Sequence, residues 1–219
     1  MATIYDCSDS AELLTGMRLA RQALGMGELI VLPTDTVYGI GCDAFNDAAV
    51  RRLLEAKGRG RNAPPPVLIP GIPTLDALAE EVPPEVRALV KEFWPGALTV
   101  ILPARESLKW DLGETHGTVA LRMPDNEIAL ELLSETGPLA VSSANLTGKP
   151  AASTAREAYV ALGDTVSVYL DGGTVGLEIV AGNDTGSTIV DATGLLIGKE
   201  LTIVRHGAIP DDDVWGVIR

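Results

Sequence analysis

Cysteine, histidine and aromatic residues are scarce in this chain of 219 residues. Two cysteines, Cys7 and Cys42, and two histidines, His116 and His206, are present, and no metal-ligand spacing joins them. This excludes a disulfide framework and gives no zinc-site pattern, so we expect no bound metal on the protein itself. Aromatic residues make up 4% of the chain and hydrophobic residues 46%, which predicts an aliphatic core.

The chain also lacks a long apolar run. Its hydrophobic stretches are short and are interrupted by glycine, proline or a charged residue, so we expect no segment that spans a bilayer. Residues 1–10 lack the basic start and the apolar stretch of a secretory signal peptide. We therefore expect a cytoplasmic protein with no membrane partner.

Basic residues are few, with 17 Lys and Arg against 30 Asp and Glu and a net charge of -13. This disfavours a broad basic face for binding a nucleic-acid backbone. Against that background, Lys57, Arg59 and Arg61 lie within five residues. Because like charges repel at this spacing, the cluster predicts a bound anion, most simply a phosphate chain. A solvated loop and a local RNA contact are the alternatives.

The apolar periodicity predicts an α/β protein. Helices are expected over residues 11–24, 48–56, 84–93, 127–134 and 154–162, the first two capped by Ser10 and Asp47. Strands are expected over residues 29–32, 67–69, 98–102, 118–123, 139–141, 166–170, 187–190 and 201–204. Because the last strands follow one another without helices between them, we expect a mixed sheet. The length favours one domain, residues 1–219, with residues 172–186 as its most loop-like region.

The two commonest nucleotide-binding signatures, the P-loop and Gly-x-Gly-x-x-Gly, are absent. Polar turns instead follow two expected strands. Residues 33–39 (PTDTVYG) contain Thr36, and residues 142–150 (SSANLTGKP) contain Ser143 and Asn145. Strand ends in open α/β sheets gather ligands, so these groups predict hydrogen bonds to a phosphate, a ribose or an amino acid. The alternative is a purely structural Ser/Asn turn.

Two arginines, Arg122 and Arg205, end expected strands. A guanidinium in that position needs a carboxylate or a phosphate, supplied by a ligand or by the protein itself. No Ser-His-Asp arrangement and no carboxylate pair for acid-base catalysis is found. The residues present favour phosphoryl or nucleotidyl transfer, in which positioning and charge neutralisation account for most of the catalysis.

Taken together, these segments resemble the threonylcarbamoyl-AMP synthase family, the YrdC-like proteins, over nearly the whole chain. The resemblance rests on segments that occur in family order. They are residues 33–39, 57–59, 93–99, 118–124, 142–150, 187–191 and 205–207. It implies a YrdC-like α/β fold, with a twisted mixed sheet flanked by helices around a central basic cavity. Because the chain ends at Arg219 without a further domain, it resembles the short, single-domain form.

The resemblance also implies a reaction that joins L-threonine, bicarbonate and ATP to give threonylcarbamoyl-AMP and pyrophosphate. The product would serve the threonylcarbamoyladenosine modification of tRNA, completed by downstream tRNA-modification proteins. ATP is the expected nucleotide substrate, with Mg²⁺ on its phosphates. Lys57 and Arg59 are the implied catalytic pair at the triphosphate. The further implied nucleotide contacts are Thr118, Ser143, Asn145 and Arg205, and the implied threonine contacts are Thr36, Arg122 and Ser187.

One departure from the family pattern concerns the basic loop. Family members usually place proline directly after the arginine of Lys-x-Arg, whereas here Gly60 and Arg61 follow Arg59. Either Arg59 or Arg61 therefore fills the family arginine position. Two other functions stay open: an RNA-binding module of the same fold that contacts tRNA or double-stranded RNA, and a divergent paralogue that uses another acceptor.

Overall fold

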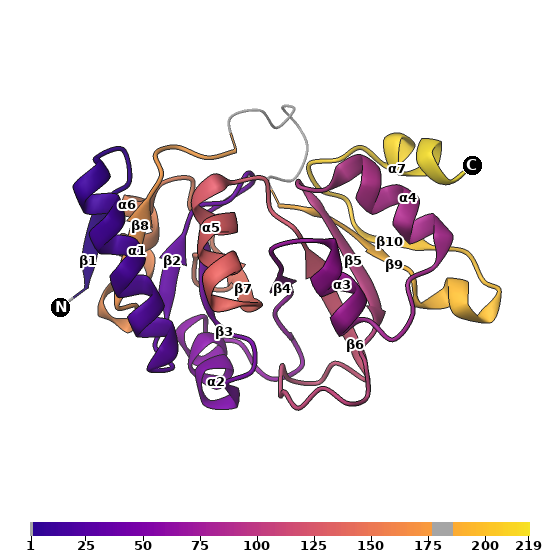
Figure 1. The fold of residues 1–219 in the computed structure, drawn as a ribbon, viewed down its shortest axis with the longest axis horizontal. Helices are drawn as coiled ribbons and strands as arrows, with labels where there is room; N and C mark the ends of the chain where they lie inside the picture. The colour runs from indigo at the N-terminus through magenta and orange to yellow at the C-terminus, as the bar shows by residue number, and fades with distance from the viewer. Residues whose placement is uncertain (1, 177–185) are drawn as a thin grey trace.

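A computed structural model describes residues 2–176 and 186–219 (Figure 1). Within these ranges one mixed sheet has the strand order β1-β8-β2-β3-β7-β4-β6-β5-β9-β10. The strands are β1 Thr3–Asp6, β2 Ile30–Leu32, β3 Gly39–Asp43, β4 Val67–Leu68, β5 Leu98–Pro103, β6 Thr118–Arg122, β7 Leu139–Ser143, β8 Val168–Asp171, β9 Thr188–Asp191 and β10 Thr202–Arg205. The pairs β1–β8, β8–β2, β4–β6 and β5–β9 are parallel, and the other pairs are antiparallel. The expected mixed sheet is confirmed.

Helices cover both faces of this sheet. They are α1 Ser10–Gly25, α2 Asp47–Ala56, α3 Ile72–Leu78, α4 Pro84–Phe93, α5 Glu127–Thr136, α6 Ala155–Leu162 and α7 Asp211–Ile218, with short 3-10 turns η1 Gly163–Thr165 and η2 Thr193–Ile197. In Figure 1, α1 and α5 lie side by side over one half of the sheet, and α3 and α4 lie over the other half. No helix in the described ranges is long and apolar enough to cross a membrane.

The strand β2, third in the sheet, is buried from both sides. Ile30 and Leu32 pack among side chains of α1 and α5, whereas Val31 between them packs in the cluster that contains the buried faces of α2 and α6. All three side chains are fully buried. Burying an aliphatic side chain contributes about 1.5–3 kcal/mol, so this strand is held firmly in place. The polar turn that follows it, residues 33–38, therefore starts from a rigid support.

Two polar turns meet because β3 pairs antiparallel with β7. The register sets Gly39 opposite Ser143, so the start of one strand lies beside the end of the other. A Cβ atom at Gly39 would lie 2.5 Å from Cγ1 of Val141, which explains why this close pairing needs a glycine. The backbone N–H of Ala144 donates to the carbonyl of Tyr38 at 2.7 Å and joins the two turns.

Several local predictions were wrong. The N-caps of α1 and α2 are Asp9 and Asn46, one residue before the expected Ser10 and Asp47, because their side chains accept backbone N–H groups of the first turn. The strands β1 and β3 and the helices α3 and α7 were not expected. Of the expected loop over residues 172–186, residues 177–185 lie outside the described residues.

Candidate functional site

A cavity of about 680 Å³ is lined by segments that are far apart in the sequence. They include the turn after β2, the basic loop after α2, the end of β6, the turn after β7 and the segments around β9 and β10. Seven of the ten predicted site residues line it. They are Thr36, Arg59, Arg122, Ser143, Asn145, Ser187 and Arg205. The structure thus brings these residues to one place, while their individual roles stay predictions.

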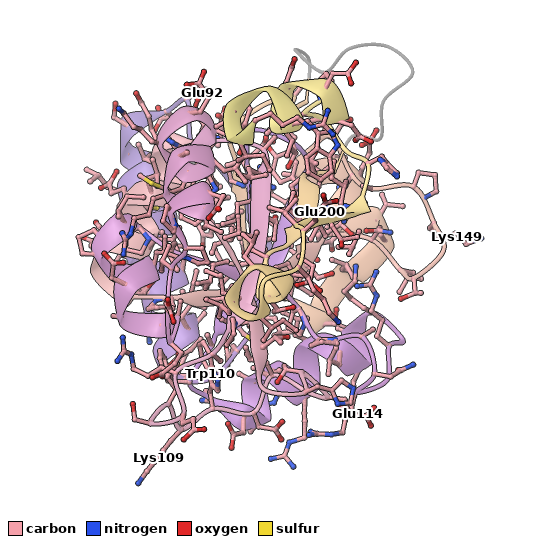
Figure 2. The ribbon with its side chains drawn as sticks, turned by 90° about the vertical axis from the view of Figure 1, so that its right-hand side faces the viewer. Glu92, Lys109, Trp110, Glu114, Lys149 and Glu200 are labelled. Atoms are coloured by element: carbon pink, nitrogen blue, oxygen red, sulfur yellow. The ribbon has the colours of Figure 1, made fainter. Side chains whose placement is uncertain are left out.

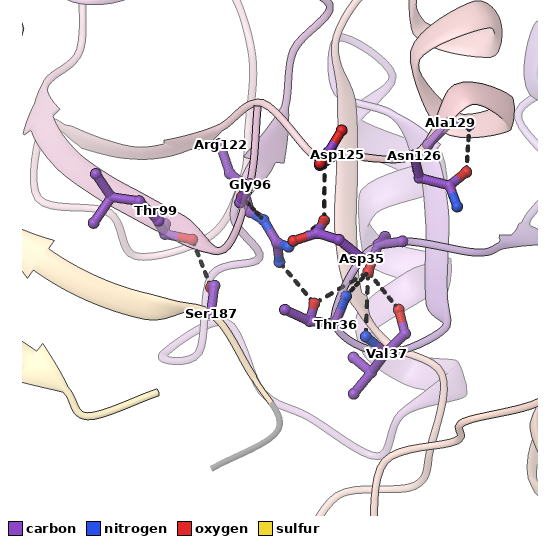
Figure 3. A network of polar contacts seen from close by, with 12 residues as sticks. Asp35, Thr36, Val37, Gly96, Thr99, Arg122, Asp125, Asn126, Ala129 and Ser187 are labelled. Carbon is purple, nitrogen blue, oxygen red and sulfur yellow. Dashed lines mark hydrogen bonds and ion pairs between the residues drawn. The ribbon is translucent and has the colours of Figure 1, made fainter. Parts of the chain in front are cut away.

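Arg122 is nearly buried and three of its donors are engaged (Figure 3). Its Nε donates to the carbonyl of Gly96 at 2.9 Å, its Nη1 to Oγ1 of Thr36 at 3.0 Å and its Nη2 to Oδ1 of Asp35 at 2.6 Å. Burial lowers the pKa of the guanidinium, and the Asp35 carboxylate opposes that shift. A guanidinium has five N–H donors, so one N–H on each terminal nitrogen is left over from these contacts. This arrangement suits a carboxylate bound in the cavity.

The turn that carries Thr36 is held by its own hydroxyls and by Asp35. Oγ1 of Thr34 accepts the backbone N–H groups of Thr36 and Val37, both at 3.2 Å, and donates to the carbonyl of Val37 at 2.6 Å. Oδ1 of Asp35 also accepts the backbone N–H of Asp125 at 3.0 Å (Figure 3). Asp35 therefore links Arg122 both to the turn after β2 and to the backbone at Asp125, which fixes the orientation of the guanidinium.

Ser187 lies between Thr99 and Arg205. Its hydroxyl is 2.7 Å from Oγ1 of Thr99 (Figure 3), and it accepts Nη2 of Arg205 at 2.8 Å. Nε of Arg205 donates to the carbonyl of Ser187, also at 2.8 Å. The two segments approach closely at Gly207, where an added Cβ would lie 2.4 Å from the carbonyl carbon of Ser187. The arginine thus positions the serine hydroxyl at the cavity wall.

Arg59 and Lys149 are further basic residues of the cavity lining, and Lys149 is exposed. Nη1 of Arg59 donates to Oγ of Ser142 and its Nε to Oγ1 of Thr147, both at 3.2 Å. Lys149 projects from the turn after β7, as Figure 2 shows, and the side-chain amide of Asn145 donates to its carbonyl at 2.6 Å. Lys149 was not among the predicted site residues, although it lies inside the motif at residues 142–150 that drew attention to this turn.

Lys57 does not line this cavity. Its side chain is 1% exposed and lies beneath the turn after β7. Its Nζ donates to the carbonyl oxygens of Ser143 and Asn145, the latter at 2.7 Å, and lies 3.4 Å from Oδ1 of Asn145. Burial, assisted by the charge of Arg59, lowers the pKa of Lys57 to about 7. The expected direct contact of Lys57 with a triphosphate stays a prediction.

Arg61 and Thr118 also lie off the cavity wall. Both terminal nitrogens of the exposed Arg61 donate to the carboxylate of Asp111 at 2.8 Å. Oγ1 of Thr118 donates to the carbonyl of Thr115 at 2.8 Å. Thr118 lines a neighbouring pocket of about 320 Å³ that shares Pro64, Pro66 and Ile189 with the cavity. Of the two arginines considered for the family position, Arg59 is the one that lines the cavity.

The described residues provide no protein site for Mg²⁺. They contain no group of three or more His, Cys, Asp or Glu side chains that could hold a metal ion. The described cavity lining contains no aspartate or glutamate. Carboxylates are the protein ligands that Mg²⁺ usually takes, together with substrate phosphates. These residues therefore do not fit a resident ion, and a magnesium ion would have to be held by the phosphate oxygens of a nucleotide.

Comparison with known proteins finds one matching family model and several similar sequences. The Sua5/YciO/YrdC family model, described as "Telomere recombination", matches residues 22–207. A putative threonylcarbamoyl-AMP synthase of Mycobacterium tuberculosis is 48% identical over 194 residues, which are 89% of this chain and 87% of that protein. The threonylcarbamoyl-AMP synthase of Bacillus subtilis is 41% identical over 202 residues, 91% of this chain and 55% of the relative.

Two solved structures are similar to this chain over nearly its whole length. Sua5 of Pyrococcus abyssi complexed with L-threonine superposes with a TM-score of 0.85 and 32% identity, covering 100% of this chain and 62% of that chain. YciO of Escherichia coli has a TM-score of 0.81 at 24% identity, covering 98% of this chain and 99% of that chain, and shows the fold alone. The expected YrdC-like α/β fold is confirmed.

Proposed function

Since the chain belongs to the Sua5/YciO/YrdC family, we propose that it is a threonylcarbamoyl-AMP synthase, an ATP-dependent transferase. It condenses L-threonine, bicarbonate and ATP to threonylcarbamoyl-AMP and pyrophosphate. The observation that carries the proposal is one cavity with a guanidinium suited to a carboxylate, at Arg122, and with further cations on other segments, at Arg59 and Lys149.

Threonine binds at Arg122 in this proposal. The two remaining N–H groups of Arg122 match the two oxygens of an amino-acid carboxylate, and a charged pair of this kind binds strongly. The hydroxyls of Thr36 and Ser187 line the same cavity and hold the polar groups on the α-carbon and side chain. The presence of L-threonine in the Pyrococcus abyssi Sua5 complex supports this substrate.

ATP occupies the rest of the cavity. Arg59 and Lys149 bind the phosphates, while Ser143, Asn145 and Arg205 hydrogen-bond the nucleotide. Thr118 contributes from the adjoining pocket, whose lining is mainly apolar and suits a base. Lys57 enters the proposal through the turn that it supports, and Arg61 is left at Asp111 outside the site. Mg²⁺ arrives with the phosphates of ATP.

The chemistry follows from placing two anions side by side. The amine of threonine and bicarbonate give a carbamate and water. An oxygen of this carbamate then attacks the α-phosphorus, the bond from that phosphorus to the bridging oxygen breaks, and the electron pair leaves with pyrophosphate. Two negatively charged reactants repel each other, so a cavity whose lining includes four basic residues lowers the barrier by charge neutralisation and orientation. These residues are Arg59, Arg122, Lys149 and Arg205.

The biological setting is part of the same proposal. We take residues 1–219 to act as one domain in the cytoplasm, where the product feeds tRNA modification by separate proteins. A net charge of -13 argues against a broad RNA-binding face. Any contact with tRNA or double-stranded RNA would therefore be local to residues 57–61.

The test is pyrophosphate release by the purified protein with ATP and Mg²⁺. Release should require both L-threonine and bicarbonate, and L-serine in place of threonine should support much less of it. Equal release with serine, or without any amino acid, would contradict the assignment and favour a paralogue with another acceptor. Salt-sensitive binding of tRNA by a protein that releases no pyrophosphate would favour the RNA-binding module.

A further inference from the structure

We propose that Lys57 is a positioning residue: it anchors the turn at residues 142–147 from beneath and thereby orients Arg59, without touching either substrate itself. This inference rests on the proposed function, because the turn forms part of the proposed nucleotide site. It assigns Lys57 a role different from the direct phosphate contact that the family resemblance implies.

The first observation is where the ammonium group lies. Lys57 follows α2 and is 1% exposed, and it is absent from the described cavity lining although Ser143, Asn145 and Arg59 are part of it. Its Nζ faces oxygen atoms of Ser143 and Asn145: two backbone carbonyls, the amide oxygen of Asn145 at 3.4 Å and the hydroxyl of Ser143 at 3.5 Å.

The second observation is that the partners of Nζ are uncharged. All of them are neutral hydrogen-bond acceptors within one short turn. An ammonium group has three donors in a tetrahedral arrangement, which lets one side chain satisfy several carbonyl oxygens at once. The carbonyl of Ser143 also accepts the backbone N–H of Asn145 at 2.9 Å, so Nζ of Lys57 is its second donor. Hydrogen bonds to a charged group contribute more than neutral ones, so the contact with Lys57 restrains the backbone of the turn.

The third observation joins the same turn to Arg59. The hydroxyl of Thr147 donates to the backbone carbonyl of Lys57 at 2.8 Å and accepts Nε of Arg59 at 3.2 Å. The backbone N–H of Thr147 donates to the same Lys57 carbonyl at 3.2 Å. Nη1 of Arg59 reaches the hydroxyl of Ser142 at 3.2 Å. Both side-chain acceptors that orient Arg59 therefore belong to the turn that Lys57 holds.

A direct phosphate contact would need a different arrangement. Nζ of Lys57 would have to leave Ser143 and Asn145 and pass the turn to reach the cavity. Under the positioning proposal it stays in place when ATP binds, and its removal acts through the order of the turn. The two possibilities therefore differ in what happens to backbone N–H groups that contact no substrate.

Hydrogen exchange of the protein without ligands measures that order. Lys57→Met keeps the length of the side chain and removes the donors. At pH 6, below the pKa of about 7 at which Lys57 loses its proton, we expect the backbone N–H groups of Asn145 and Thr147 to exchange at least about tenfold faster than in the wild type, since the hydrogen bonds lost are of the charged kind. The matched control is Lys109→Met, an exposed lysine at another part of the surface (Figure 2), which should leave both rates unchanged. Unchanged exchange in a folded Lys57→Met protein would overturn the proposal.

Steady-state kinetics supply a second readout. Lys57→Met and Arg59→Ala should each raise the KM for ATP by about tenfold or more while changing the KM for threonine by less than about threefold. Because Lys57 acts through the turn that orients Arg59, the double variant should fall short of the product of the two effects by at least about fivefold. A fully multiplicative loss would overturn the proposal in favour of two independent phosphate contacts.

Two provisions keep the outcomes separate. If Lys57→Met does not fold, Thr147→Val tests the same link, because it removes the hydroxyl that joins Lys57 to Arg59. This variant should raise the KM for ATP, and an unchanged KM for ATP would contradict the proposal. If the wild-type protein releases no pyrophosphate with threonine and bicarbonate, the proposed function fails, while the exchange experiment still decides whether Lys57 orders the turn.

Discussion

Replacing Arg122 with alanine should remove threonine binding selectively. The variant loses the two N–H groups that are left for a carboxylate, each worth about 1.5–3 kcal/mol as a hydrogen bond to a charged group. Together they amount to about 10²- to 10⁴-fold in kcat/KM for threonine. The KM for ATP should change by less than about threefold, because Arg122 is proposed to bind only the amino acid.

The structure also predicts a cost in stability that must be separated from this effect. Arg122→Ala leaves the carboxylate of Asp35, 18% exposed, without its cationic partner. Breaking a buried ion pair on one side costs about 3–5 kcal/mol. In Arg122→Ala/Asp35→Asn the orphaned charge is gone, while an amide oxygen still accepts the backbone N–H of Asp125. The melting temperature of this double variant should lie above that of Arg122→Ala.

The assay is pyrophosphate release at varied threonine and saturating ATP, with circular dichroism to show that each variant is folded. The reasoning is refuted if the folded double variant keeps a kcat/KM for threonine within about threefold of the wild type. Arg122 would then be a structural cation that serves only to hold Gly96, Thr36 and Asp35 together.

Three further predictions concern the basic groups around the cavity. Arg59→Ala should raise the KM for ATP by about tenfold or more. Arg61→Ala removes only an exposed ion pair and should change the KM for ATP by less than about twofold. A larger effect of Arg61→Ala than of Arg59→Ala would place Arg61 in the site. Lys149→Ala should raise the KM for ATP by about three- to tenfold without lowering the melting temperature. The control is Lys109→Ala, and a Lys149→Ala variant with the same KM for ATP as this control would remove Lys149 from the phosphate site. Because burial lowers the pKa of Lys57 to about 7, below its ordinary 10.5, the unfolded chain binds more protons than the folded protein above pH 7. The contribution of Lys57 to stability should therefore rise from about pH 7 to pH 8, below the ordinary pKa of about 8.5 of the two cysteine thiols in the unfolded chain. Thermal melts over that range should show a rise in the wild type relative to Lys57→Met, and parallel curves would contradict it.

The sequence predicted best where a single periodic pattern fills an element. The helix expected over residues 84–93 is α4 with the same bounds, because its buried side recurs at helical spacing. The strand β3 was missed because its sequence, GIGCD, has two glycines in place of the alternating β-branched residues that signal a strand. Those glycines are explained only by Val141 on the neighbouring strand β7, which no local pattern reveals.

The site was predictable as a set of segments and less so as a set of contacts. Lys57, Arg59 and Arg61 look alike in sequence, yet they lie beneath a turn, at the cavity and at Asp111 respectively. Their partners are 50 to 90 residues away along the chain, so the direction of each side chain is decided by tertiary structure. Strand ends and the family resemblance identified the cavity, whereas the burial of Lys57 and the part played by Lys149 required the folded arrangement.

The proposed reaction requires that one cavity hold threonine and ATP together. A crystal structure with L-threonine and a non-hydrolysable ATP analogue bound at the same time tests this requirement. We expect the threonine carboxylate on the terminal nitrogens of Arg122 and the phosphates against Arg59, with Nζ of Lys57 still on the carbonyls of Ser143 and Asn145. Threonine bound away from Arg122, or phosphates bound at Arg61 outside the cavity, would show that the proposed site is wrong.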